Sequence, residues 1–279
     1  MNSAADSARM IAATKEGFKR NRIYPVFFMW ETGLFESLKD VLAGLFGRGV
    51  ERIGGASDIS DAILEKLARP TGRSIWRDIK SDAAKAFRKN AGGASAIAEI
   101  VGANLDRKAP LQMHVAGHSA GAVFLGELLK TWTVPTPIAS AALMAPACTV
   151  GFYKNAFLPA LSGAKPMFGR IEQYNLIDAR EIADNVAIFY RKSLLYLVSR
   201  ALEEHDEEPL LGLERHSSTL PLPARHIVRY AGRDRPQTDS PNHSGFDNDV
   251  ATMNSLLALI LGVKPKPSLA FKANELDFG

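Results

Sequence analysis

The chain has 279 residues, 46% of them hydrophobic, and is therefore long enough to bury a sizeable core as one large domain or as a domain with an inserted cap. Its 34 lysines and arginines against 30 acidic residues give a net charge of only +4, a modest excess that does not indicate a dedicated polyanion-binding surface or a nucleic-acid partner. The single cysteine, Cys148, excludes an intramolecular disulfide and favours a reducing, cytoplasmic location.

The sequence also lacks the patterns of membrane and secreted proteins. Its first residues carry neither the basic region nor the apolar region of a secretory signal. The longest strongly apolar stretches, 194–198 and 256–263, are too short to cross a bilayer. We therefore expect a soluble protein with no transmembrane segment.

The N-terminal part of the chain is expected to be mostly helical. Residues 3–20 have amphipathic spacing, with basic residues at the C-terminal end, where they suit the helix dipole. Residues 23–30 predict a strand covered on both faces, because the run is almost continuously apolar. No strand signal of that quality recurs before residue 109. The spacing predicts helices instead at 34–46, 58–68 and 94–105, with Pro70 as a break.

Residues 69–89 hold the densest group of basic side chains. These side chains are spaced like one face of a helix and are interrupted by Asp78 and Asp82. We interpret them as a face exposed to water; binding of an anion or an acidic surface is the alternative.

The most informative motif is Gly117-His118-Ser119-Ala120-Gly121. It follows the apolar run 111–116 and opens a segment with helical spacing, so Ser119 is expected where a strand turns sharply into a helix. Such a turn is typical of a nucleophile elbow, in which small residues two places before and after the serine let strand and helix pass without a clash. The alternative is an ordinary Gly/Ser turn at a helix start.

Three more strands are expected after the elbow, at 138–144, 170–176 and 226–231. The apolar spacing predicts a helix at about 183–202 and a final helix in which Val250, Met253, Leu257 and Leu261 align. Between the last strand and the last helix lies a loop that contains His243. This alternation predicts an α/β fold with a mostly parallel sheet.

A serine hydroxyl needs a base to take its proton and a carboxylate to orient that base. We expect Ser119, Asp178 and His243 to form this triad, because each follows a predicted strand and their order is that of α/β-hydrolases. Four histidines, 114, 205, 216 and 226, are more easily structural or solvated. Glu181 and Asp184 compete with Asp178, whose other reading is an N-cap.

These residues resemble the α/β-hydrolase superfamily, specifically bacterial lipase-like or esterase-like serine hydrolases with a Gly-His-Ser-Ala-Gly elbow. The resemblance covers residues 23–30 and 111–262 and implies a three-layer sandwich, an acyl-enzyme on Ser119 and an oxyanion-hole N–H from Ala120. It implies no metal and no organic cofactor. The helical excursions at about 31–109 and 179–222 of a single domain, 1–279, would then form the lid and acyl pocket.

The chain departs from that family in one respect, because no His-Gly-containing loop precedes Ser119 to supply the second oxyanion donor. Either the N-terminal strands of the fold are missing, or residues 23–30 are the earlier strand and residues 31–34 the oxyanion loop. The first register leaves a sheet edge that a partner, such as a second copy of the chain, could cover.

The sequence therefore supports three hypotheses. The first is a soluble serine hydrolase that cleaves a carboxylic ester or related acyl bond in a small-molecule substrate. The second is a catalytically weak or silent hydrolase-fold protein that serves as a binding module, and the third is an acyltransferase that passes the acyl group to an alcohol or amine.

Overall fold

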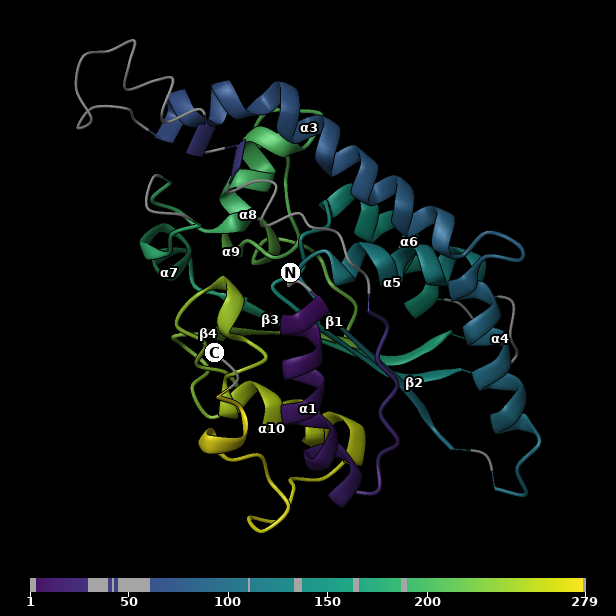
Figure 1. Cartoon of the computed structure of the whole chain (residues 1–279). Helices are drawn as coiled ribbons and strands as arrows, with labels where there is room; N and C mark the ends of the chain where they lie inside the picture. Colours follow the sequence, from purple (N-terminus) through teal and green to yellow (C-terminus); the bar gives the residue numbers. More distant parts are fainter. Residues whose placement is uncertain are drawn as a thin grey trace. The chain divides into compact units, whose positions relative to one another are not determined.

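The computed structural model describes residues 4–29, 40–41, 43–44, 61–109, 111–132, 137–162, 166–186 and 190–277 (Figure 1). Contacts divide the chain into two compact units, which we describe separately. Unit 1 comprises Met1–Arg77, Leu176–Glu208 and Tyr230–Gly279, and unit 2 comprises Asp78–Asn175 and Pro209–Arg229. Whether the chain is a single domain stays a prediction.

Four parallel strands form one sheet in the order β1 (Met113–His118), β2 (Ile138–Met144), β3 (Phe168–Leu176) and β4 (His226–Ala231). Main-chain bonds from the Ile171 N–H to the Arg225 carbonyl and from the Ile177 N–H to the Ala231 carbonyl continue the parallel register onto β4. The sequence predicted all four strands, and β2 and β4 have the predicted bounds. The α/β class and the parallel sheet are thus confirmed.

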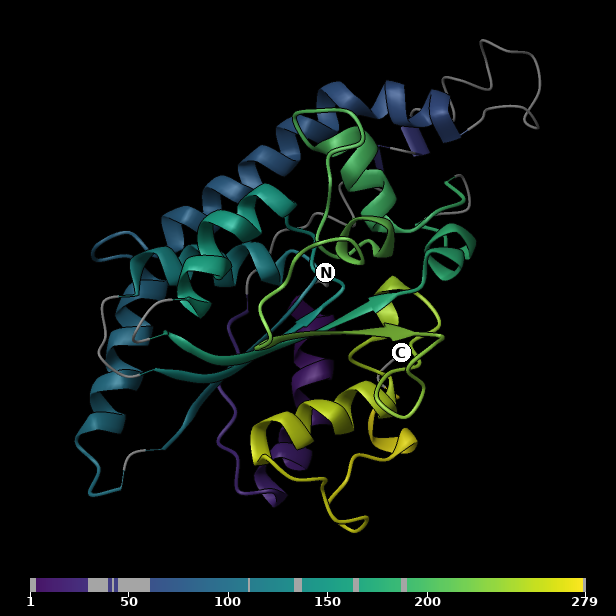
Figure 2. The same cartoon turned by 180° about the vertical axis from the view of Figure 1, so that it is seen from behind.

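Unit 2 has its core between the sheet and two helices. Helix α5 (Gly121–Thr131) packs against β1 and against α6 (Val150–Leu161) (Figure 2). Helix α4 (Gly92–Leu105) confirms the helix predicted at 94–105, and the short α9 (Glu214–Ser217) precedes β4. The ring of Phe157 on α6 stacks on that of Phe168 on β3, with both side chains fully buried. This contact packs α6 against the amino end of β3, at the opposite edge of the sheet from Ser119.

Unit 1 joins the two ends of the described chain. Helix α1 (Ala4–Arg20) confirms the first predicted helix, and its Arg20 pairs with Glu275 of the short helix η3 (Ala273–Glu275). Phe18 meets Phe271 edge to face, with ring centroids 5.3 Å apart. Helix α10 (Val250–Leu261) confirms the final predicted helix and ends at Gly262, whose φ of 70° is that of a C-terminal glycine cap.

Helix α3 (Asp61–Ala86) runs through Pro70, so the predicted break there is wrong. Close packing holds the helix at this point, because a Cβ at Gly72 would come within 2.4 Å of the Leu202 side chain.

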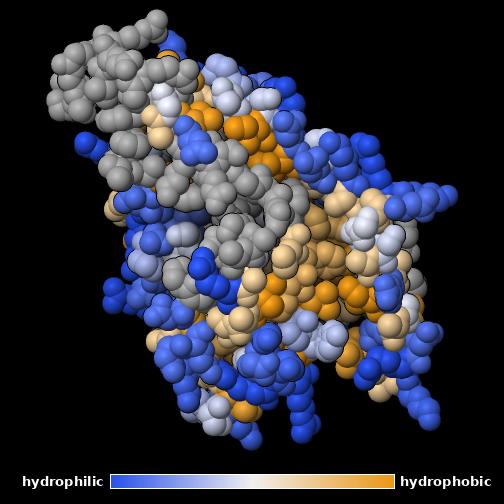
Figure 3. Space-filling view, in the orientation of Figure 1, coloured by the Kyte–Doolittle hydropathy of each residue, from blue (hydrophilic) through white to orange (hydrophobic). Residues whose placement is uncertain are grey.

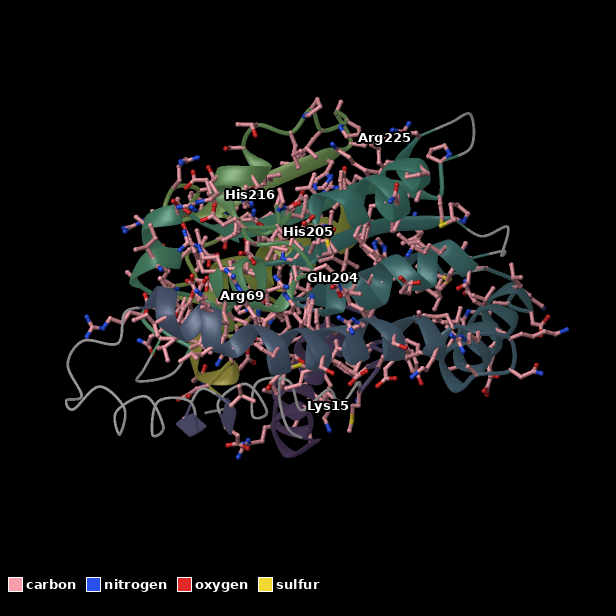
Figure 4. All side chains as sticks on the ribbon, turned by 90° about the horizontal axis from the view of Figure 1, so that it is seen from above. Lys15, Arg69, Glu204, His205, His216 and Arg225 are labelled. Atoms are coloured by element: carbon pink, nitrogen blue, oxygen red, sulfur yellow. The ribbon has the colours of Figure 1, made fainter. Side chains whose placement is uncertain are left out.

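The basic face of α3 is partly neutralised within unit 1. Arg69 and Arg73 pair with Asp206 at 2.7 and 2.9 Å, and Arg77 pairs with Glu204 at 3.1 Å. Figure 4 labels Arg69 on α3 and Glu204 in the chain that follows η1 (Val198–Leu202). For these three arginines, the prediction of a merely solvated face is therefore incomplete.

The strand predicted at 23–30 is wrong for the residues that the structure describes. Residues 23–29 are chain without regular secondary structure, and Trp30 lies outside the described residues. Four apolar side chains in this segment are exposed: Tyr24 at 81%, Val26 at 47%, Phe28 at 41% and Met29 at 54%. Figure 3, which views the molecule from the same side as Figure 1, shows apolar surface in orange on that side. An apolar run predicts a buried strand only where neighbouring strands and helices cover it.

The helix predicted at about 183–202 is also wrong in its extent. The structure has α7 (Asp178–Ala183), then non-helical chain, then α8 (Leu194–Leu197), which continues as one π-helical turn, η1 (Val198–Leu202). The second helix begins where Ser193 caps it, because the Ser193 hydroxyl accepts the N–H of Tyr196. Apolar spacing continues across the gap and therefore gave no sign of the interruption.

The helix predicted at 34–46 lies mostly outside the described residues, as does the alternative oxyanion loop at 31–34. Residues 40, 41, 43 and 44 are described and are helical. The helix predicted at 58–68 begins at Asp61 among the described residues. Within the described ranges, no helix combines the length and apolarity needed to cross a membrane.

Candidate functional site

Ser119 occupies the turn between β1 and α5, as the sequence predicts. Its φ is 54°, in the left-handed region that residues other than glycine seldom adopt. Its N–H donates to the carbonyl of Met144 at 2.8 Å, and its carbonyl accepts the N–H of Ala147 at 3.0 Å. Two main-chain bonds therefore hold the strained serine against the chain at the end of β2. A strand, a strained serine and a helix in this order are the local structure that a nucleophile elbow requires.

The two glycines of the motif differ in their packing. A Cβ at Gly117 would lie 2.9 Å from the main chain of Gly121 and equally close to the Leu125 side chain. A Cβ at Gly121 would have no heavy atom within 4 Å. The steric argument made from the sequence therefore explains Gly117 but not Gly121.

We expect Gly117→Ala to destabilise the protein by about 1–3 kcal/mol, because strand and helix must separate to make room for the methyl group. Gly121→Ala is the matched control and should leave the stability unchanged or raise it by up to about 1 kcal/mol, since alanine favours helices. Urea unfolding of both variants measures the difference. Equal losses in the two variants would show that Gly117 is not sterically required.

Ala120 supplies a main-chain donor next to Ser119. The residue is fully buried, and its N–H forms no hydrogen bond with any described residue. It stands at the N-terminus of α5, where the helix dipole favours negative charge. That this N–H serves as the oxyanion donor beside Ser119 stays a prediction.

Asp178 is the first residue of α7, just after β3. The N-cap of α7 is Ile177, so the alternative reading of Asp178 as an N-cap is wrong. One oxygen of the Asp178 carboxylate accepts the hydroxyl of Tyr196 from α8 at 2.8 Å. The side chain is half-buried. A carboxylate has further lone pairs, so this bond does not prevent a second one to a histidine ring.

His243 opens the short helix η2 (His243–Gly245) and is 6% exposed. Its main-chain N–H donates to Oδ2 of Asp184 at 2.8 Å, and Oδ1 of Asp184 accepts the N–H of Asn185 at 2.8 Å. Burial raises the pKa of Asp184, and these two hydrogen bonds oppose the shift. The structure therefore brings together two residues that the sequence singled out, Asp184 and His243.

Arg180 fixes the loop before His243. Its guanidinium donates to the main-chain carbonyls of Asp239 and Ser240, at 3.0 and 2.6 Å, and to the Asp239 carboxylate at 2.8 Å. These three bonds hold the segment 239–240 firmly against α7. The sequence did not indicate a role for Arg180, because its partners Asp239 and Ser240 lie 59 and 60 positions later in the chain and no local pattern connects them.

Glu181 is completely buried on α7, and neither of its carboxyl oxygens forms a hydrogen bond with a described residue. Burial raises its pKa to about 8. The nearby Ser193 hydroxyl lowers the pKa of Glu181, although it does not meet the geometry of a hydrogen bond. The negative charges of Asp184 and Asp178 raise this pKa further. The group is therefore mainly protonated at neutral pH. The sequence offered Glu181 only as a competitor for the triad acid.

Three histidines have structural partners: His114 and His226 on strands, and His216 on α9. His226 lies between Tyr153, whose hydroxyl is 2.8 Å from Nδ1, and the Gln173 side-chain oxygen, 2.9 Å from Nε2. Burial lowers the pKa of His226 to about 4, so the ring is neutral at neutral pH. The other contacts are between His114 Nδ1 and Ser140 Oγ at 2.7 Å and from the Leu210 N–H to His216 Nδ1 at 3.1 Å. These rings stabilise the fold, as expected.

Unit 2 also contains an apolar cavity of about 150 Å³ between α4 and α5. Leu128, Thr131 and Trp132 line it from the C-terminal end of α5. Since Ser119 precedes the N-terminal end of that helix, the cavity does not adjoin the elbow. In the described ranges, no group of three or more histidine, cysteine, aspartate or glutamate side chains could hold a metal ion.

The predicted site residues fall in both units. Ser119 and Ala120 belong to unit 2, and Asp178, Asp184 and His243 belong to unit 1. That Ser119 meets His243 therefore stays a prediction. Comparison with protein-family models, with curated proteins and with solved structures found no match for this chain.

Proposed function

We propose that this protein is a serine hydrolase of the α/β-hydrolase type that cleaves a carboxylic ester or a related acyl bond. Ser119 is the nucleophile, His243 the general base and acid, and Asp178 or Asp184 the carboxylate that orients the histidine. The observation that carries the proposal is the strained Ser119, with a φ of 54° between a parallel strand and the start of a helix.

The chemistry follows from these roles. Ser119 Oγ attacks the acyl carbon while His243 takes its proton, and the N–H of Ala120 stabilises the resulting oxyanion. His243 then gives the proton to the leaving alcohol, which leaves an acyl-enzyme. Water, activated by the same histidine, releases the acid and restores the serine. No step requires a cofactor.

Two features of unit 1 support these roles. The main-chain N–H of His243 donates to the Asp184 carboxylate, which supports Asp184 as a candidate for the orienting group beside Asp178. This bond ties Asp184 to the backbone of the proposed base and not to its imidazole ring. The three bonds from Arg180 hold the loop before His243 in place. A base that is fixed in this way loses little entropy when it enters the transition state.

A fluorophosphonate probe tests the proposal, because it reacts rapidly with an activated serine and hardly at all with an ordinary one. We expect one adduct per chain, on the peptide that contains Ser119, and no adduct after the protein is unfolded in urea. Mass spectrometry of the digested protein locates the label. Absence of labelling in the folded protein would favour the silent binding module instead.

A further inference from the structure

Glu181 is a buried acid for which the proposed catalytic steps have no role. It lies three residues after Asp178, which is on the same side of α7, and three before Asp184, the extended residue that caps the C-terminus of this helix. Its side chain is fully buried, and neither oxygen has a hydrogen-bond partner among the described residues. Such an arrangement is costly for an ionised carboxylate.

The charged groups around Glu181 do not compensate a negative charge there. Asp178 and Asp184 are themselves acidic, and they engage Tyr196 and the His243 main chain. The nearest cations in sequence are bound elsewhere: Arg180 donates to Asp239, and Lys192 pairs with Asp61 and Glu65. A proton is therefore what makes the burial of Glu181 tolerable, in agreement with its raised pKa.

We propose that Glu181 is a positioning residue: it carries a proton in the working enzyme, so that α7 holds Asp184 against the main chain of His243. When Glu181 releases this proton on the alkaline side of neutrality, a third negative charge repels Asp178 and Asp184 and loosens the segment that holds the base. The effect on catalysis rests on the proposed hydrolase function. The protonation of Glu181 in the folded protein does not depend on that function.

The sign of the stability effect follows from linkage. The folded state raises the pKa of Glu181 from 4.5 to about 8, so its stabilising contribution is fully present below about pH 4.5 and is lost as the pH rises to about 8. Glu181→Gln keeps the shape of the neutral acid and cannot ionise. We therefore expect the unfolding equilibrium constant of the wild type, relative to that of this variant, to rise about tenfold per pH unit over this interval.

The experiment compares the wild type, Glu181→Gln and the control Glu99→Gln, which changes an exposed acid on α4. Urea unfolding and the hydrolysis of p-nitrophenyl acetate are measured from pH 5 to pH 9. We expect Glu181→Gln to match the wild type in kcat near pH 6 and to keep its activity above pH 8, where the wild type loses it. Glu99→Gln should follow the wild type in both measurements.

Each outcome decides a separate part of the proposal. Parallel stability profiles for the wild type and Glu181→Gln would overturn it, and so would a stability difference with identical activity profiles. A stability difference in a protein that hydrolyses no ester at any pH would contradict the hydrolase function but leave the protonated Glu181 in place. If Glu181→Gln does not fold, Glu181→Met replaces it; failure of both neutral variants to fold at pH 5 also overturns the proposal.

Discussion

Ser119→Ala is expected to lower kcat/KM for ester hydrolysis by at least about 10⁴-fold, because it removes the only atom that forms the acyl-enzyme. Hydrolysis of p-nitrophenyl acetate by the purified protein measures the loss. A residual rate above that of water can persist, since the N–H of Ala120 remains in place to stabilise the oxyanion.

The substitution should not disturb the fold, which makes the result interpretable. The bonds that hold Ser119 to Met144 and Ala147 are made by its main chain and survive in the variant. We therefore expect an unchanged Tm. Ser95→Ala, at an exposed position of α4 in the same unit, is the matched control and should keep full activity. Unchanged hydrolysis in Ser119→Ala would refute the nucleophile.

The second large effect is expected from His243→Gln, which removes the group that moves the proton in both half-reactions. We expect kcat to fall by about 10²–10⁴-fold, the range of a general acid–base catalyst. The main-chain bond to Asp184 does not depend on the side chain and should hold the loop in place. Activity within a few-fold of the wild type would assign the base to another residue.

Asp184→Asn and Asp178→Asn identify the carboxylate that acts with His243. We expect the larger loss of kcat in Asp184→Asn, because Asp184 contacts His243 whereas Asp178 accepts the hydroxyl of Tyr196. The amide oxygen in Asp178→Asn can still accept the Tyr196 hydroxyl, whereas Asp184→Asn keeps an acceptor for only one of the two main-chain N–H groups that Asp184 binds. Urea unfolding of both variants therefore accompanies the comparison of kcat. A larger loss in Asp178→Asn would restore the acid that the sequence favoured.

The sheet could be predicted from the sequence because its strands are buried. The residues of β2 have little or no exposed surface, and a strand buried on both faces appears as a continuous apolar run. β3 is buried as well but carries polar Glu172, Gln173 and Asn175, so only its partial alternation indicated a strand. The turn at Ser119 could be predicted because Gly117 lies where β1 and α5 approach so closely that a side chain would not fit.

Other features depend on contacts that no local pattern contains. The apolar residues 23–29 are typical of a buried strand, yet no covering of the segment can be inferred from the segment itself. Arg69 finds its partner Asp206 far along the chain, so a charged helix face appeared solvated. Glutamate is seldom fully buried, and its type alone therefore gave no hint of the environment of Glu181.

The most direct test of the account is the crystal structure of the fluorophosphonate adduct. Our account predicts phosphorus bonded to Ser119 Oγ, a phosphonyl oxygen that accepts the N–H of Ala120, and Nε2 of His243 within hydrogen-bond distance of Ser119 Oγ. A structure in which the His243 ring lies further from Ser119 Oγ than one bridging water can span would contradict the catalytic mechanism.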